Sequence, residues 1–358
     1  MNNKDIIEVF IINYNGEKVI LSTIQSLLNS VDVNISISVI DDFSTDNSIE
    51  LVKNQYPNVP IYQMPFNQKR ANVLRNKALE LAKAKYVFIT DNDLIFDKKC
   101  LSELYKYIED DETIATCTPR LMYLNEPSRV YVAGTRIHFI GAAITDKRDQ
   151  IYEEENDLPT VNSGSGICLV DREIAIKHGG FDVHLMQGWG SDGEFYHTLL
   201  LAGYKCIYIP SAFALHEAKL NVKERKFRAI GQTHNRWVFI LTHYNLSTIL
   251  LLLPAFLIYE VLQIGFVSFN GLLPEYIKGN LLIIKNFNYV IQKRKRIQSS
   301  RKVSDFDILY SGRIFIAPSL IEKYKLLGTL INSFSYLLDL YWRLLKFFFQ
   351  KKLIFYLA

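Results

Sequence analysis

Short apolar runs alternate with helix-like stretches through the first 93 residues, and this alternation limits the possible folds more than any other feature. Apolar residues spaced three and four apart predict helices, whereas short apolar runs that end at polar turns predict buried strands. The predicted strands are residues 6–12, 35–40, 59–63 and 86–90, and the predicted helices are residues 17–29, 48–54 and 70–83. Such alternation is typical of an α/β fold, with a mostly parallel sheet covered by helices on both faces.

Polar clusters follow three of the four predicted strands. Residues 13–16 (Asn-Tyr-Asn-Gly), 41–46 (Asp-Asp-Phe-Ser-Thr-Asp) and 91–93 (Asp-Asn-Asp) each begin where an apolar run ends. In open α/β sheets, ligands bind beyond the carboxyl ends of the strands. We therefore expect Asp91 and Asp93 to face a divalent cation that also binds phosphate oxygens. The simpler alternative for an isolated pair of carboxylates is a solvated turn.

The charge of the chain is divided unevenly. The net charge is +4, but residues 1–216 have 20 Lys and Arg against 29 Asp and Glu, whereas residues 217–358 have 21 against 8. The basic part also contains long aliphatic runs, which favour an anionic lipid surface over nucleic acid as its partner. We therefore expect a sheet domain in residues 1–216 and a basic, apolar, helical membrane-associating region in residues 217–358.

The apolar stretch at residues 247–269 is long enough to cross a bilayer, and its alternative is a buried helix. Crossing the membrane once or twice would leave the basic residues 293–296 (Lys-Arg-Lys-Arg) outside, against the positive-inside tendency. We therefore expect this stretch, together with residues 326–349, to lie in or dip into the inner leaflet. In this interpretation residues 293–296 form a basic loop over anionic lipid.

The cysteines and the N-terminus indicate the compartment. The four cysteines are scattered along the chain without a CxxC spacing, which favours a reducing compartment over a zinc site or a disulfide framework. The first 12 residues lack the charged segment and the cleavage site of a signal peptide. We therefore expect a peripheral or monotopic protein at the cytoplasmic face of the cell membrane.

In their order along the chain, seven motifs resemble those of glycosyltransferase family two, whose catalytic domain has the GT-A fold. The resemblance runs from residue 8 to residue 216. The motifs are residues 9–16 (VFIINYNG), 39–48 (VIDDFSTDNS), 75–82 (which begin Arg-Asn), 90–93 (TDND), 161–182 (with NSGSGICLVDREI and GGFD), 188–195 (GWGSDGEF) and 201–216 (LAGYKCIYIPSAFALH). The resemblance implies a Rossmann-like GT-A catalytic domain in residues 1–216 that binds a nucleotide-sugar donor.

The resemblance also assigns residues to the donor. Tyr14 would stack on the nucleotide base, and Asp41 would accept a hydrogen bond from the edge of that base. Arg70 or Arg75 would neutralise the diphosphate, and Asp91 would face the ribose and the cation. From position alone, Tyr14 is as readily a core aromatic residue, and Asp41 a helix-capping residue.

Two further residues match the metal site of the family. Asp93 is the stronger candidate for a direct metal ligand, and His216 matches the late histidine that completes the site. The resemblance therefore implies a divalent cation, Mg²⁺ or Mn²⁺, as cofactor. Outside the motif, a single histidine at a strand end is more often structural.

Asp192 matches the position of the catalytic base. Inverting transfer is one in-line displacement at the anomeric carbon, and it needs a carboxylate that removes the proton of the acceptor hydroxyl. Trp189, in the same motif, would stack on a sugar face or pack against its own loop. A surface aspartate without a catalytic role is the alternative for Asp192.

Three departures from the family pattern qualify the prediction. Ser191 replaces the glutamate of the usual Glu-Asp pair, so an acceptor contact is either lost or moved to Glu194. Residues 232–237 (Gln-Thr-His-Asn-Arg-Trp) have three residues between Gln and Arg, where the processive synthases have two, which favours transfer of a single sugar. Phe43 stands where glycine is usual.

The sequence thus predicts a metal-dependent, inverting glycosyltransferase of hexosyl or deoxyhexosyl type. Its expected acceptor is a hydroxyl group of a lipid-linked or growing cell-surface glycan. The alternative from another class is a noncatalytic membrane-associated protein that keeps the GT-A fold. A nucleotidyltransferase is disfavoured because residues 9–16 contain one glycine rather than a glycine-rich phosphate loop.

Overall fold

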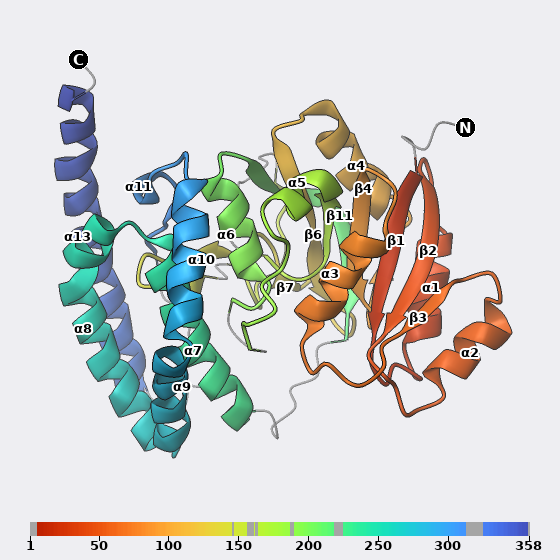
Figure 1. Cartoon of the computed structure of the whole chain (residues 1–358), viewed down its shortest axis with the longest axis horizontal. Helices are drawn as coiled ribbons and strands as arrows, with labels where there is room; N and C mark the ends of the chain where they lie inside the picture. Colours follow the sequence, from red (N-terminus) through yellow and green to blue (C-terminus); the bar gives the residue numbers. More distant parts are fainter. Residues whose placement is uncertain are drawn as a thin grey trace.

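The computed structural model describes residues 6–144, 147–155, 161, 164–186, 190–217, 225–312 and 325–356. In these residues a large sheet with helices on both faces occupies one end of the molecule, and a group of helices from the C-terminal region occupies the other (Figure 1).

The predicted alternation of strands and helices is confirmed at the start of the chain. Successive elements are β1 (Ile6–Asn13), α1 (Ile20–Leu28), β2 (Asn34–Asp41), α2 (Ser48–Gln55), β3 (Ile61–Gln63), α3 (Ala71–Leu81) and β4 (Tyr86–Asp91). In α1, Ile20, Ile24 and Leu27 are fully buried, as expected for apolar residues spaced along one face of a helix. The strands β1 and β4 are apolar on both faces because helices cover both sides of the sheet.

The sheet is mixed, with the strand order β3-β2-β1-β4-β10-β6-β11-β5 and with β7 beside β6. The later strands are β5 (Leu94–Phe96), β6 (Ile114–Tyr123), β7 (Val130–Val132), β10 (Cys168–Asp171) and β11 (Lys205–His216), while β8 (Arg136–Ile137) and β9 (Ala143–Ile144) pair separately. As expected, the neighbouring strands β3, β2, β1 and β4 are parallel, and so are β6 and β11. The strand β10, in contrast, lies between β4 and β6 and is antiparallel to both.

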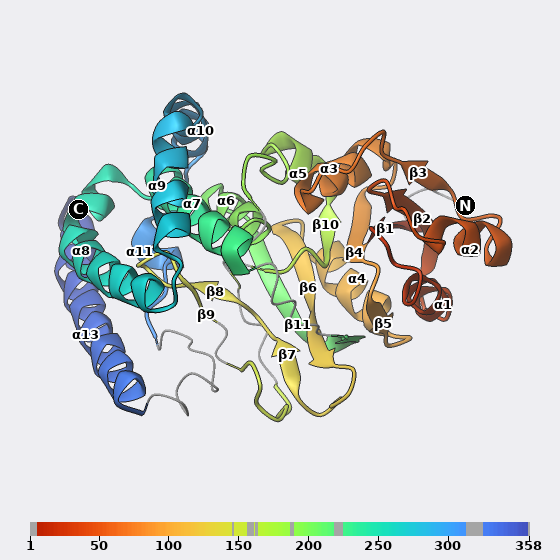
Figure 2. The same cartoon turned by 90° about the horizontal axis from the view of Figure 1, so that it is seen from below.

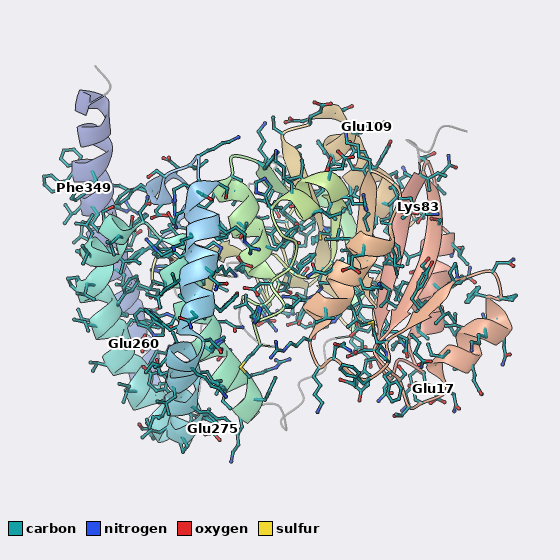
Figure 3. All side chains as sticks on the ribbon, in the orientation of Figure 1. Glu17, Lys83, Glu109, Glu260, Glu275 and Phe349 are labelled. Carbon is teal, nitrogen blue, oxygen red and sulfur yellow. The ribbon has the colours of Figure 1, made fainter. Side chains whose placement is uncertain are left out.

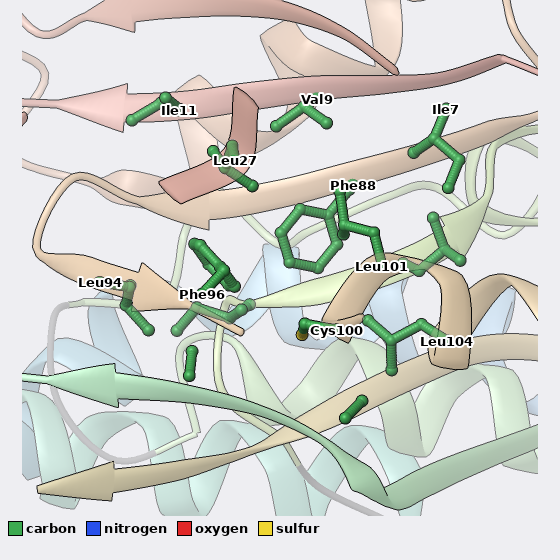
Figure 4. Packing of buried hydrophobic residues seen from close by; sticks show 14 of the residues in the cluster. Ile7, Val9, Ile11, Leu27, Phe88, Leu94, Phe96, Cys100, Leu101 and Leu104 are labelled. Carbon is green, nitrogen blue, oxygen red and sulfur yellow. The ribbon is translucent and has the colours of Figure 1, made fainter. Parts of the chain in front are cut away.

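Two hydrophobic clusters, one on each face, hold the helices to this sheet. One face is covered by α1 and α4 (Cys100–Asp110), and the other by α3, α5 (Arg172–Lys177) and α6 (Gly193–Leu201). Figure 4 shows the first cluster, where Leu27, Leu101 and Leu104 from the helices surround Phe88 of β4. Full burial of each side chain of this size stabilises the folded state by about 1.5–3 kcal/mol.

The C-terminal region forms helices that pack against the sheet domain. They are α7 (Arg225–His243), α8 (Leu246–Phe269), α9 (Leu273–Lys285), α10 (Phe287–Ser299), α11 (Asp305–Ile308) and α13 (Lys325–Tyr356). Their cluster of buried residues includes Phe139 and Ile140 from the part of the chain before β11. The ring of Phe139 stacks on that of Trp342 in α13, with centroids 4.8 Å apart. The two predicted regions therefore share a hydrophobic core.

The prediction of a basic loop at residues 293–296 over lipid is wrong. These residues lie in α10, and Lys293 is buried in ion pairs with Asp182 and Glu194. Arg294 donates through Nη1 to the carbonyl oxygens of Leu241 and Tyr244, at 2.6 and 2.8 Å. Half of this basic run therefore holds protein elements together, because a helix turns neighbouring side chains toward different surroundings.

The helix α8 carries an extensive exposed apolar surface. It is the one helix in the described parts of the chain that is long and apolar enough to cross a membrane, and 17% of its most apolar window is buried. Figures 1 and 2 both place α8 beside α13 at the end of the molecule far from β1 and β2. Glu260, labelled in Figure 3, is a charged residue within the apolar sequence of α8, and its carboxylate pairs with Arg236 of α7. The exposed apolar residues of α8 are Leu246, Leu250, Leu253, Leu257, Ile258, Val261, Leu262, Ile264, Phe266 and Phe269.

Candidate functional site

The carboxyl ends of β1, β2 and β4 meet at one edge of the sheet. The parallel register pairs Asn13 with Asp41 and Ile12 with Asp91. Asn13 donates through Nδ2 to Oδ1 of Asp41 at 2.8 Å, and Asn92 donates to Oδ1 of Asn13 at 2.6 Å. The three polar clusters predicted from the sequence therefore form one hydrogen-bonded edge (residues 13–16, 41–46 and 91–93). We call it the donor edge, after the nucleotide-sugar donor that the family resemblance implies.

Asp41 is fully buried and organises this edge. Its Oδ1 accepts hydrogen bonds from Asn13 and from the Ser44 hydroxyl, at 2.8 and 2.5 Å. Its Oδ2 accepts from the Ser44 backbone N–H and from Nε2 of Gln63, at 2.9 and 3.1 Å. Because a carboxylate has about four acceptor positions, these four donors occupy it. The predicted contact of Asp41 with a nucleotide base stays a prediction.

Two aromatic side chains are exposed beside Asp41. Tyr14 and Phe43 are 52% and 46% exposed, and they lie on loops that hydrogen bonds join. The N–H of Asn15 donates to Oγ of Ser44, and the N–H of Thr45 donates to Oδ1 of Asn15, both at 2.8 Å. Phe43 has a φ of +62°, which is uncommon for a residue other than glycine and explains why the family pattern has glycine there. Tyr14 is thus not a core residue, and its side chain is accessible for stacking.

Arg75 brings a buried positive charge to Asp91. Its Nη2 lies 3.5 Å from Oδ1 of Asp91, and its Nη1 donates to Oδ1 of Asn72 at 3.0 Å. A Cβ atom at Gly166 would overlap this guanidinium group, so any side chain at that position would displace Arg75. Burial raises the pKa of Asp91; the charge of Arg75 opposes this rise, and the carboxylates of Asp93 and Asp192 add to it. Of the two predicted arginines, Arg75 lies at the donor edge, whereas Arg70 is exposed and donates to the carbonyl oxygen of Val183 at 2.6 Å.

Asp93 and His216 meet at the same edge. The antiparallel pairing of β5 with β11 places His216 opposite Leu94, and Nε2 of His216 lies 3.3 Å from Oδ2 of Asp93. The imidazole also stacks on the ring of Tyr131, with centroids 4.6 Å apart. Oδ1 of Asp93 and Nδ1 of His216 are buried and have no hydrogen-bond partner in the described residues.

This pair suits one side of a divalent-cation site. No group of three or more His, Cys, Asp or Glu side chains that could hold a metal is found in the part of the chain that the structure describes. A carboxylate and an imidazole are nevertheless ordinary ligands of Mn²⁺, and phosphate oxygens of a substrate commonly complete such a shell. The cation that the sequence implies stays a prediction.

Asp192 lies at the N-terminus of α6, directly after Ser191, whose carbonyl oxygen accepts a hydrogen bond from the Asn72 side chain that also binds Arg75. Its Oδ1 accepts the N–H of Gly193 at 3.0 Å, and in the described residues no hydrogen bond involves its Oδ2. Glu194, two residues later, points away, because a helix turns residues two apart toward different sides. Its Oε1 accepts from Thr198 at 2.8 Å and lies 2.7 Å from Nε2 of His243. Glu194 is therefore buried and paired within the protein, which disfavours the predicted shift of an acceptor contact to this residue.

Three asparagine residues at this site had no individual role assigned to them from the sequence. Asn13 and Asn92 link the strand ends, and Asn72 donates to the carbonyl oxygen of Ser191. The position of Asn13 at the end of a strand was the available signal, whereas Asn72 lies within an ordinary helical pattern and gave none. Trp189 lies outside the described residues.

Residues 8–172 match the family model described as "Glycosyl transferase family 2". These residues, slightly less than half of the chain, form a glycosyltransferase family 2 domain. The match covers the donor edge and ends before Asp192, so it supports the motif assignments at β1, β2 and β4 rather than the role of the later motifs.

One curated relative and two solved structures extend this result. The poly(ribitol-phosphate) beta-N-acetylglucosaminyltransferase TarP of Staphylococcus aureus is 34% identical over 103 residues, which are 28% of this chain and 31% of TarP. The crystal structure of GalNAc-T7 with UDP, GalNAc and Mn²⁺ aligns with a TM-score of 0.54 and 15% identity, over 69% of this chain and 49% of that chain. That of S. aureus TarS 1–349 aligns with a TM-score of 0.50 and 16% identity, over 82% and 88%.

These likenesses establish the fold. The chain spans about a third of the length of TarP, so the similarity between the two sequences is confined to one part of each protein. At 15–16% identity the structural likenesses show the GT-A-like architecture, with its mixed sheet and flanking helices. The predicted fold class is confirmed.

Proposed function

We propose that this protein is a metal-dependent, inverting glycosyltransferase that moves a single sugar from a nucleotide-sugar donor to an acceptor hydroxyl. The observation that carries the proposal is the position of Asp192 at the N-terminus of α6, directly after Ser191. The carbonyl oxygen of Ser191 accepts a hydrogen bond from Asn72, which also binds the Arg75 guanidinium group beside Asp91. This arrangement offers a carboxylate base on one side and a charged diphosphate-binding surface on the other.

The donor would lie along the donor edge. Tyr14 is exposed and available to stack on the base, while Arg75 provides positive charge for the diphosphate. Asp93 and His216 would hold a divalent cation, which when bound stabilises the negative charge of the leaving diphosphate. The hydrogen bonds among Asn13, Asp41 and Ser44 hold this edge in place before the donor binds, so little reorganisation is needed.

Asp192 would act on the acceptor. Its Oδ1 is held by the N–H of Gly193, which leaves Oδ2 to receive the proton of the attacking hydroxyl group. The hydroxyl oxygen then forms a bond with the anomeric carbon as the bond to the diphosphate breaks. Because attack and departure occur on opposite faces, the configuration of the product is inverted.

The acceptor is proposed to be lipid-linked or part of a growing cell-surface glycan, reached at the cytoplasmic face of a membrane. The exposed apolar residues of α8 support this, because a surface of this extent on a soluble protein usually contacts a membrane or a partner. TarP is named for transfer of N-acetylglucosamine to poly(ribitol-phosphate), in agreement with a polymeric acceptor.

The test of this function is Asp192→Asn in the full chain, assayed with a panel of nucleotide sugars and acceptors. Loss of general-base assistance is expected to lower kcat by about 10²–10⁴, with the donor Kd nearly unchanged. The matched control is Asp171→Asn, because Asp171 also caps a helix, accepting the N–H of Ile174 at 3.0 Å, and should leave kcat unchanged.

Two results would contradict the mechanism: a normal rate in Asp192→Asn, or a product that retains the anomeric configuration of the donor. A wild-type chain that neither transfers the sugar nor hydrolyses any donor in the presence of Mg²⁺ or Mn²⁺ would favour the noncatalytic alternative.

A further inference from the structure

The residues that lead to Asp192 are held by side chains from two sides. We call residues 181–186 and 190–192 the Asp192 loop. On one side is α3, where Asn76 exchanges two hydrogen bonds with the backbone of Phe181, at 2.7 and 2.8 Å. Asn72 of the same helix donates to the carbonyl oxygen of Asp182 at 2.9 Å and to that of Ser191. The helix that carries Arg75 thus also positions the Asp192 loop.

The other side is formed by the C-terminal helices. Asn235 of α7 is fully buried and exchanges two hydrogen bonds with the backbone of Met186. The N–H of Met186 donates to Oδ1 of Asn235 at 3.0 Å, and Nδ2 of Asn235 donates to the Met186 carbonyl oxygen at 2.7 Å. Tyr289 of α10 donates to the carboxylate of Asp182. Two helices outside the sheet domain therefore hold this loop together with α3.

Lys293 of α10 joins the loop to the start of α6. Its Nζ contacts Oδ2 of Asp182 and lies 3.1 Å from Oε1 of Glu194, and all three side chains are almost completely buried. Lys293 and the imidazole of His243 hold the pKa of Glu194 well below its usual range, although burial opposes this. Buried ion pairs are expensive to desolvate and rarely add net stability, whereas removal of one partner leaves an uncompensated charge. A positional role is therefore a better reason for this cluster than stability.

We propose that α7 and α10 are part of the catalytic unit, with Asn235 and Lys293 as positioning residues that set the place of Asp192 relative to the donor edge. The inference rests on the proposed role of Asp192 as the base. It extends the active site from residues 1–216 into the C-terminal region. The geometric requirement is strict, because a displacement of about 1 Å can lower a rate by roughly 100-fold.

The first test is Asn235→Ala, with Asn280→Ala as matched control. Asn280 lies in α9, and its side chain donates to the Tyr276 carbonyl oxygen of its own helix at 3.1 Å, so its loss should not move the Asp192 loop. For Asn235→Ala we expect kcat for sugar transfer to fall at least about 10-fold, with the donor Kd within about twofold of wild type. We also expect amide exchange in residues 181–186 and 190–193 to accelerate at least about 10-fold, while exchange in β1 is unchanged.

The second test is Lys293→Met, with Lys295→Met as its control. Lys295 lies in the same helix but is exposed, and both changes remove one lysine charge. Lys293→Met should lower kcat at least as much as Asn235→Ala, and Lys295→Met should not. If Lys293→Met does not fold, the asparagine pair decides alone.

The outcomes separate the two proposals. A wild-type chain without transfer activity refutes the proposed function, whatever the exchange data show. A wild-type chain that is active, with Asn235→Ala equally active or slowed only as much as Asn280→Ala, refutes the positioning role. An equal loss of donor affinity and kcat in Asn235→Ala would also refute it, because that result indicates general damage to the fold.

Discussion

Replacement of Asp41 by asparagine should lower the stability of the ligand-free protein, whatever its effect on donor binding. The change keeps the size of the side chain but turns one acceptor oxygen into an NH₂ group. Each carboxylate oxygen of Asp41 accepts two hydrogen bonds. In either orientation of the asparagine side chain, its NH₂ group must therefore face two hydrogen-bond donors. The magnitude of the effect follows from which donors can reverse their roles.

The less costly orientation places NH₂ at the position of Oδ1. There the Ser44 hydroxyl can rotate to accept, but Asn13 cannot turn its amide without losing the hydrogen bond from Asn92. The opposite orientation would face the Ser44 backbone N–H, which cannot become an acceptor. One hydrogen bond to a charged acceptor is lost, worth about 1.5–3 kcal/mol, and the remaining ones weaken because the acceptor becomes neutral. We expect a total loss of about 2–4 kcal/mol.

The measurement is thermal unfolding of the ligand-free chain. For a protein of this length the expected loss corresponds to a decrease in Tm of roughly 3–5 °C.

The control is Asp42→Asn, the neighbouring isosteric change. Burial raises the pKa of Asp42, although hydrogen bonds from the backbone of Gln68 and Lys69 oppose the rise. Neutralising Asp42 should therefore cost less than about 1 kcal/mol. An unchanged Tm in Asp41→Asn together with weaker donor binding would show that Asp41 serves the nucleotide and not the fold.

Three further predictions concern the donor edge and the membrane. Gly166→Ala should displace the Arg75 guanidinium and weaken donor binding at least about 10-fold, measured by calorimetry; unchanged affinity would show that Arg75 is not used. Asp93→Asn should abolish the enhancement of donor binding by Mg²⁺ or Mn²⁺, and full activity of the wild-type chain in EDTA would contradict the cation site. Val261→Glu in α8 should reduce binding to lipid vesicles in a flotation assay, whereas Leu28→Glu, at an exposed apolar position of α1, should not; equal binding of all three proteins would exclude α8 as the contact.

The GT-A-like fold and the position of its donor edge could be predicted because both depend on local patterns. An apolar run followed by a polar turn specifies a strand and its end, and parallel strands place those ends at one edge. The strand ends that carry Asp41 and Asp91 therefore meet as expected from the sequence alone. The meeting of Asp93 with His216 was predicted only through the family resemblance, because 122 positions separate them and no local pattern links them.

The tertiary structure decided which charged residues face the site and which serve the interior. Lys293 looks from the sequence like one of four lipid-facing basic residues, but it pairs with Asp182 and Glu194, about 100 positions earlier in the chain. Similarly, the local sequence does not distinguish the surroundings of Asp192 and Glu194, but at the start of α6 Asp192 is partly exposed and Glu194 is buried. Sequence patterns specify local conformation, whereas the partner of a buried charge depends on distant elements that only the folded chain brings together.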